Sequence, residues 1–591
     1  MHPLAPLLPF VRRYWRFYAL GLSAALLATL ATASIPWLIG RAVDGINTRG
    51  VDQAELLRYG GLLLLAALAS SIVSFGQRIW IGRASYLVET DLREMMFNKL
   101  LSFDQGFYGE MHTGDLMARV TNDISAIRMF LGPGINSLAG AGLLIIAAAG
   151  LMLGVNIVIG LMVLALLPAV VLIFVVIGAR MRKIFRKVQD QFGVVSTRAQ
   201  ENFSGIRTIK AYAQEEAEVE SFRTVNEAYR KENLRYVLLS GLLWPLIGMV
   251  LGLIGALVVL VGGQQVAAGT MTLGSLVLFN AYLAQLGWPM IALGWTVDLY
   301  QQAAASMTRL NEVQQRRPQI ASPRAPVVAT LVGDVEFRDV GVRYDQPKDA
   351  HGVATPQRAD AWMLRDISFR VPRGTTLAIV GATGAGKTTL VNLLARVRDP
   401  DAGQVLLDGH DVRALALPDL RAAVGYVPQD TFLFSVPLRD NVTFGRTDAP
   451  EEAVQRAVTI SRLVGDLEQL PDGIATLIGE RGVTLSGGQK QRTAIARAVL
   501  RDPVVLVLDD ALSSVDTHTA SEILSGLRTI LQEKTGIIIA QRIATVRDAD
   551  QIIVLHDGRV AERGSHRALL AAGGRYAAMY RRELLQSEME E

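Results

Sequence analysis

The chain has 591 residues, of which 50% are hydrophobic and 19% are charged, with a net charge of +4 and a mean hydropathy of +0.30. This length predicts several domains, and the charged fraction lies below the roughly 25% that is usual for soluble globular proteins. The chain has no cysteine, which excludes disulfides and thiol chemistry, and its seven histidines lack the spacing of a zinc site.

The N-terminal half contains uncharged stretches that are long enough to cross a bilayer, which takes about 20 apolar residues in a helix. Residues 17–40 and 59–77 each predict one span. Residues 129–179 and 236–297 each predict two spans, with turns expected at 154–156 and 262–265. Six spans are therefore expected, which excludes a soluble nucleic-acid ATPase even though the net charge is positive.

Basic residues predict the orientation of these spans, because cytoplasmic loops carry an excess of Lys and Arg. Arg12, Arg13 and Arg16 precede the first span, and a basic cluster at 180–187 follows the fourth. The turns after the third and fifth spans contain no Lys or Arg. We therefore expect a multi-pass protein of the cytoplasmic membrane with both termini in the cytoplasm.

Two charged segments, 78–128 and 180–235, separate the spans and have helical periodicity. Each is interrupted near its middle, at 108–115 and 205–216, so we expect long helical extensions with short crosswise helices at their tips, rather than solvated loops. These tips would contact a cytoplasmic domain. Prolines at 318, 323 and 326 then mark a linker. The expected domains are a transmembrane domain at 1–315, a linker at 316–332 and a second domain at 333–591.

The second domain contains a phosphate-binding loop. Residues 381–389 read GATGAGKTT, which matches G-x-x-x-x-G-K-[ST] between an apolar strand at 376–380 and a helical stretch at 389–394. The candidate ATP-binding residues of this loop are Gly381, Ala382, Thr383, Gly384, Ala385, Gly386, Lys387, Thr388 and Thr389. We expect Lys387 to reach the β- and γ-phosphates and the Thr388 hydroxyl to bind Mg²⁺.

Two further motifs accompany the loop. The apolar strand 504–509 ends at Asp509, whose carboxylate is expected to hold Mg²⁺ beside the phosphates. Residues 485–489 read LSGGQ, in which Ser486, Gly487, Gly488 and Gln489 predict an anion-binding turn at the start of a helix.

With these motifs in this order, nearly the whole chain resembles the ATP-binding-cassette family, whose signature is LSGGQ. Six spans followed by one cassette resemble the half-transporter exporters of that family. The resemblance implies a multidomain fold, with an α-helical transmembrane bundle and an α/β P-loop nucleotide-binding domain. It also implies transport driven by ATP and Mg²⁺, with each ATP held between the phosphate loop of one chain and the signature of a second.

The resemblance carries over to four further places. It implies that Tyr344 stacks on adenine and that Gln429 senses Mg²⁺ and the attacking water. Residues 476–482 resemble the exporter loop that touches the intracellular helices, and 513–516 stand where the loop between the two cassettes belongs. A polar insert at 346–361 departs from the family pattern shortly after Tyr344 and weakens the assignment of Tyr344 to adenine stacking.

Two departures affect the chemistry. Asp510 stands where the family has a glutamate that polarises the attacking water, and Gln541 replaces a histidine in TGIIIAQR. With Gln429, these are the candidate catalytic residues. Both changes fall in one ATP site while the signature is intact, which resembles one subunit of a heterodimeric bacterial multidrug or lipid exporter. The alternatives are a slow homodimeric exporter and an ATP-gated channel or regulator.

The expected substrate is a hydrophobic or amphipathic drug, lipid or peptide, because the long apolar stretches contain no counter-ion for a charged one. Asp298, near the inner end of the sixth span, is a candidate contact for a cationic group or a solvated helix end. The expected partners are a second half-transporter chain and membrane lipids, without nucleic acid.

Overall fold

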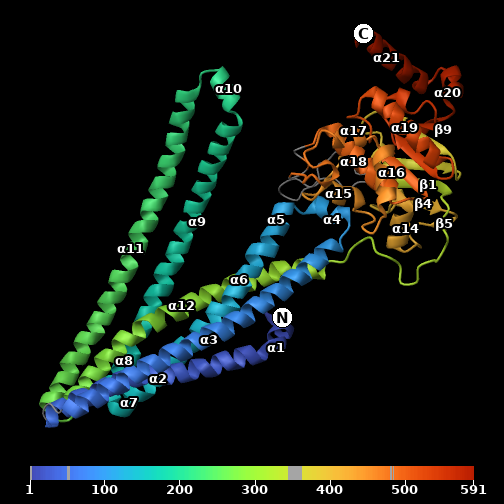
Figure 1. Ribbon diagram of the computed structural model, residues 1–591. Helices are drawn as coiled ribbons and strands as arrows, with labels where there is room; N and C mark the ends of the chain where they lie inside the picture. Colours follow the sequence, from blue (N-terminus) through green and yellow to red (C-terminus); the bar gives the residue numbers. More distant parts are fainter. Residues whose placement is uncertain (1–2, 50–52, 344–361, 480–481, 483–484, 591) are drawn as a thin grey trace. The chain divides into compact units, whose positions relative to one another are not determined.

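The computed structural model describes residues 3–49, 53–343, 362–479, 482 and 485–590. The chain forms two compact units. The first comprises Met1–Ser102 and Met111–Arg316, and the second comprises Phe103–Glu110 and Arg317–Glu591. Figure 1 labels the elements of both units.

The described residues of the first unit are almost all helical. Its elements are η1 Ala5–Leu7, α1 Leu8–Arg13, α2 Trp15–Arg49, α3 Gln53–Leu101, α5 Thr113–Ala118, the π-helical η2 Arg119–Asp123, α6 Ile124–Met129, the π-helical η3 Phe130–Gly134, α7 Ile135–Val155, α8 Ile157–Leu166, α9 Pro168–Ser204, α10 Ile206–Ala211, α11 Glu215–Ala267 and α12 Leu273–Gln315. Among the residues that the structure describes, six helical stretches are long and apolar enough to cross a membrane. The six predicted spans are therefore confirmed.

The two predicted turns between paired spans have different outcomes. Asn156 separates α7 from α8 and caps α8 by accepting a hydrogen bond from the Ile159 amide, as expected. The turn expected at 262–265 is wrong, because α11 continues to Ala267 and the chain turns at 268–272. Gly262 serves packing instead: a Cβ there would lie 2.6 Å from Leu276 on α12.

The charged segments extend the membrane helices, and each is interrupted by a short helix. The helices α9 and α11 lie side by side and are joined by α10 (Figure 1). The helix α4, Gln105–Glu110, interrupts the other segment and belongs to the second unit. There, Asp104 accepts a hydrogen bond from the Gln319 amide at 2.8 Å. The contact at Asp104 is thus with the segment predicted as the linker, and the contact of the two tips with a cytoplasmic domain stays a prediction.

Polar side chains inside the first unit bond across neighbouring helices. Gln77 donates to Asn136 at 2.8 Å, and the Tyr282 hydroxyl donates to the Ala33 carbonyl at 2.6 Å. Such bonds satisfy polar groups where water is excluded. Asp298, the candidate contact for a cationic group, forms an ion pair with Arg182 of the same chain at 2.9 Å.

In the part of the second unit that the structure describes, the strands form two sheets surrounded by helices. Its strands are β1 Val335–Arg343, β2 Trp362–Val371, β3 Thr376–Gly381, β4 Ala402–Leu407, β5 His410–Asp411, β6 Val424–Val427, β7 Val505–Asp509, β8 Thr535–Ile539, β9 Gln551–His556 and β10 Arg559–Gly564. Its helices besides α4 are α13 Lys387–Leu394, α14 Leu417–Ala423, α15 Leu438–Thr443, α16 Glu451–Ile460, α17 Val464–Leu467, η4 Gly473–Ala475, α18 Gly487–Leu500, α19 Thr517–Leu531, η6 Ile543–Thr545, α20 His566–Ala572 and α21 Arg575–Glu590. The smaller sheet has the order β2-β1-β4-β5 and the larger β10-β9-β3-β8-β7-β6.

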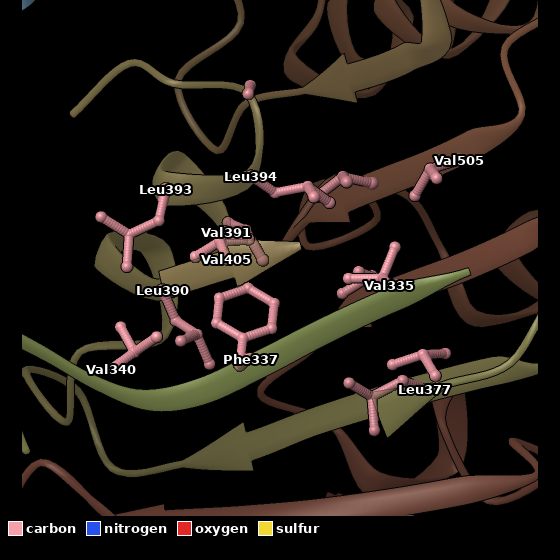
Figure 2. Packing of buried hydrophobic residues seen from close by; sticks show 14 of the residues in the cluster. Val335, Phe337, Val340, Leu377, Leu390, Val391, Leu393, Leu394, Val405 and Val505 are labelled. Carbon is pink, nitrogen blue, oxygen red and sulfur yellow. The ribbon is translucent and has the colours of Figure 1, made fainter. Parts of the chain in front are cut away.

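The larger sheet brings the predicted motifs to one edge. Strands β9, β3, β8, β7 and β6 are parallel neighbours, so their carboxyl ends meet, and ligands bind at such an edge. A buried core between the sheets fixes α13: Figure 2 shows Phe337 of β1 beside Leu390 of α13. Because α13 begins at Lys387, this core positions the phosphate-binding loop.

Candidate nucleotide-binding site

The phosphate-binding loop has the predicted strand, loop and helix around it. It connects β3 to α13, and Gly386 caps α13 with a φ of 97°. Glycine is required there, because a Cβ on Gly386 would also lie 2.6 Å from the Leu364 side chain. Lys387 is buried, and its ammonium donates to the carbonyl oxygens of Gly381 and Ala382 at 2.8 and 3.0 Å.

Asp509 lies beside the loop and is held from two sides. The Thr388 hydroxyl donates to its Oδ1 at 3.2 Å, and the Tyr426 hydroxyl donates to its Oδ2 at 3.2 Å. The carboxylate is almost fully buried, which raises the pKa of Asp509 against the lowering effect of these hydrogen bonds. Burial lowers the pKa of Lys387, while nearby Asp510 and Asp509 raise it.

The loop and its neighbours fit a magnesium-bound nucleotide. The hydroxyl of Thr388 and the carboxylate of Asp509 form the oxygen donor set that Mg²⁺ prefers, next to a buried lysine. These two residues would hold the metal ion, which would supply positive charge beside the phosphates. Gln429, the third candidate, is exposed just after β6, at the same edge of the sheet.

Asp510 and Gln541, which the sequence analysis expects to depart from the family pattern, contact each other. Asp509 pairs with Ile539 in the register of β7 and β8, so the residues that follow these strands are neighbours. The Gln541 side-chain amide donates a hydrogen bond to Oδ2 of Asp510 at 3.1 Å. Asp510 is 8% exposed and has a φ of 48°, in the left-handed region. One carboxylate oxygen of Asp510 is thus engaged by Gln541.

The signature turn has the expected place at the start of α18. Ser486 caps this helix and accepts from the Gln489 amide, while the Gln489 side chain accepts from the Ser486 amide at 2.9 Å. This reciprocal pair fixes the turn that also contains Gly487 and Gly488. Of the other residues expected at the site, Thr389 is buried in α13, whereas Ala382, Thr383 and Gly384 are exposed and Ala385 is half-buried.

Tyr344 and residues 480 and 481 of the 476–482 loop lie outside the described residues, so their predicted roles stay predictions.

Two positioning residues were missed from the sequence. Tyr426 was quoted only as part of the segment around Gln429, but its hydroxyl contacts Asp509. Gln491, on α18, donates to the Ser513 hydroxyl at 3.0 Å and accepts from the Ser514 amide at 2.9 Å. It therefore joins the signature helix to the loop at 513–516. The strand order would have pointed to Tyr426, since β6 is adjacent to β7.

The chain matches two family models in tandem. Residues 18–290 match the ABC transporter transmembrane region, and residues 364–513 match the ABC transporter model. The chain is 34% identical to the probable multidrug resistance ABC transporter ATP-binding/permease protein YheI of Bacillus subtilis, over 98% of this chain and 97% of that protein. It is 32% identical to the ATP-dependent lipid A-core flippase of Thiobacillus denitrificans, over 98% of each.

Two more similarities agree with these. The multidrug resistance-like ATP-binding protein MdlA of Escherichia coli is 32% identical, over 100% of this chain and 98% of that protein. The solved structure of a bacterial Atm1-family ABC exporter with ATP bound is 29% identical, with a TM-score of 0.78, and covers 97% of this chain and 98% of that one. The chain therefore belongs to the ABC transporter family, as a half-transporter with one transmembrane region, one nucleotide-binding domain and an Atm1-like exporter fold.

Proposed function

We propose that this chain is the subunit of a heterodimeric ABC exporter whose phosphate loop forms the degenerate ATP site. The observation that carries the proposal is the hydrogen bond from Gln541 to Asp510, because it ties together the two positions that depart from the family pattern. The chain would bind ATP at this site and hydrolyse it slowly, while its signature completes a competent site with the partner's phosphate loop.

The chemistry of the pair supports slow hydrolysis. The aspartate carboxylate falls about 1 Å short of the position that a glutamate would reach, and a misplacement of this size can cost about 100-fold in rate. A base must also be within hydrogen-bonding reach of the proton that it abstracts. Here one oxygen of Asp510 already accepts from Gln541, whose amide can carry neither a proton nor a positive charge.

The binding parts of the site support retained nucleotide affinity. Lys387, Thr388 and Asp509 lie together around the phosphate-binding loop, as binding requires. The signature turn has its complete cap, and Gln491 joins it to the loop at 513–516. We therefore infer that only hydrolysis is impaired and that the signature turn can still complete the partner's ATP site.

On the membrane side, we infer export of a hydrophobic or amphipathic drug, lipid or peptide across the cytoplasmic membrane. The names of two relatives, a multidrug resistance protein and a lipid A-core flippase, agree with that substrate class. The proposed transmembrane domain is 1–315, the linker is 316–332 and the cassette is 333–591. The basic residues at 12–16 and 180–187 support a cytoplasmic location for both termini.

The test is ATP turnover by the purified full-length chain, alone and with the product of a neighbouring half-transporter gene. We expect slow turnover by the single chain and at least tenfold faster turnover by the pair. Uptake of a lipophilic dye into inside-out vesicles should follow the same order. Full turnover by the single chain would instead identify a homodimeric exporter, and turnover without dye accumulation against a gradient would favour a channel or regulator.

A further inference from the structure

An open and mainly apolar groove between α9 and α11, edged by basic side chains, takes no part in the chemistry described above. It has a volume of about 570 Å³. Its walls are Arg180, Lys183 and Ile184 of α9 and Arg235, Leu238, Leu239 and Leu242 of α11. We call this feature the α9–α11 groove. Both helices belong to the first unit and lie side by side along this region (Figure 1).

The groove lies at the boundary between apolar and charged sequence on both helices. On α9, the uncharged stretch 129–179 ends directly before Arg180, and on α11 the uncharged stretch 236–297 begins directly after Arg235. Such a boundary marks the depth at which lipid chains give way to headgroups. On the apolar side, Leu238 is 75% exposed and Leu242 is 48% exposed. The groove therefore combines cations at headgroup depth with an apolar wall at chain depth.

Two of the three cations are uncompensated. Among the described residues, Arg180 and Lys183 have neither a hydrogen-bond partner nor an ion-pair partner. Arg235 is paired with Glu232 on its own helix. The nearby cation Arg182 is neutralised by Asp298, which leaves Asp298 occupied as well. The α9–α11 groove thus carries net positive charge.

We propose that the α9–α11 groove binds the headgroup of an anionic phospholipid, with the phosphate at Arg180 and Lys183 and an acyl chain along Leu238 and Leu242. A free anion would gain nothing from the apolar wall, and a neutral lipid would leave the cations unpaired. The proposed orientation of the chain assigns this lipid to the cytoplasmic leaflet. Lipid binding itself depends on neither the heterodimer nor the degenerate site, so the two proposals can fail separately.

The test measures phosphatidylglycerol binding to the full-length transporter in phosphatidylcholine nanodiscs, by native mass spectrometry of the lipids retained. The variant Arg180→Gln/Lys183→Gln removes the two uncompensated cations. Its matched control is Arg186→Gln/Lys187→Gln, which removes the same charge from exposed positions of α9 outside the groove. We expect about 30-fold weaker binding for the groove variant and less than a twofold change for the control.

Each other outcome overturns the proposal. Equal losses in both variants would mean diffuse attraction to the membrane surface. Displacement of phosphatidylglycerol by millimolar inorganic phosphate would mean a site for free anions. If the groove variant does not fold, the proposal is tested by comparing the lipid preference of the wild-type protein with that of Leu238→Gln. We expect the wild type to prefer phosphatidylglycerol to phosphatidylcholine and Leu238→Gln to weaken that preference. The absence of either effect would contradict lipid binding.

Discussion

The hydroxyl of Tyr426 lies 3.2 Å from Oδ2 of Asp509 and 3.0 Å from Oδ1 of Asn392. Burial and the adjacent Asp509 raise the pKa of Tyr426, so the phenol stays protonated and acts as a donor. With the Thr388 hydroxyl on the other oxygen, it fixes the orientation of the carboxylate that is expected to bind Mg²⁺.

Tyr426→Phe should therefore weaken the response to Mg²⁺ more than nucleotide binding itself. A hydrogen bond to a charged acceptor contributes about 1.5–3 kcal/mol, so we expect the Mg²⁺ concentration for half-maximal binding of a fluorescent ATP analogue to rise about tenfold. Tyr576→Phe is the matched control, because Tyr576 is buried and its hydroxyl lies 2.7 Å from His566, away from the site. An unchanged Mg²⁺ titration would show that Tyr426 has no positioning role.

Restoring the family residues should restore hydrolysis at this chain's own site. We expect Asp510→Glu/Gln541→His to speed single-turnover ATP cleavage there by about 100-fold in the assembled transporter. Because the two residues are hydrogen-bond partners, the rate gains of the two single variants should not add up to the rate gain of the double variant. Adding Lys387→Ala to the double variant should abolish the gain. Cleavage that stays at the wild-type rate in the double variant would refute the degenerate-site assignment.

Gln491→Ala should loosen the loop at 513–516 without unfolding α18. Both polar ends of the Gln491 side chain bond to this loop, and loss of a typical hydrogen bond costs about 1 kcal/mol. We expect amide hydrogen exchange of Ser514 to become about fivefold faster. Gln532→Ala, at an exposed position following α19, should leave the exchange of Ser514 unchanged. Equal exchange in Gln491→Ala and the wild type would contradict the link.

Gly274→Ala should destabilise the transmembrane unit. A Cβ on Gly274 would lie 2.0 Å from the Gly40 carbonyl oxygen, and the Gly274 amide donates to Asp44 at 2.7 Å. Because backbone atoms block the new methyl group, α2 and α12 must separate, at a cost of about 1–3 kcal/mol. Gly248→Ala is the control, since a Cβ there meets no atom within 4 Å in this chain. Thermal unfolding in detergent should separate the two variants.

Much of the fold was predictable, because long uncharged runs and the phosphate-loop motif depend on local sequence alone. The turn at 268–272 was not, since a glycine such as Gly262 indicates a turn equally well when it serves close packing. The contact of Gln541 with Asp510 depends on the register of two strands that are distant in sequence. The same holds for Tyr426, whose role depends on β6 lying next to β7.

The assignment of α4 to the cassette unit has a mechanical consequence. The chain passes between the two units three times, after residues 102, 110 and 316. Because both ends of α4 lead into the first unit, a cut between 317 and 332 removes only one of the three connections between the units.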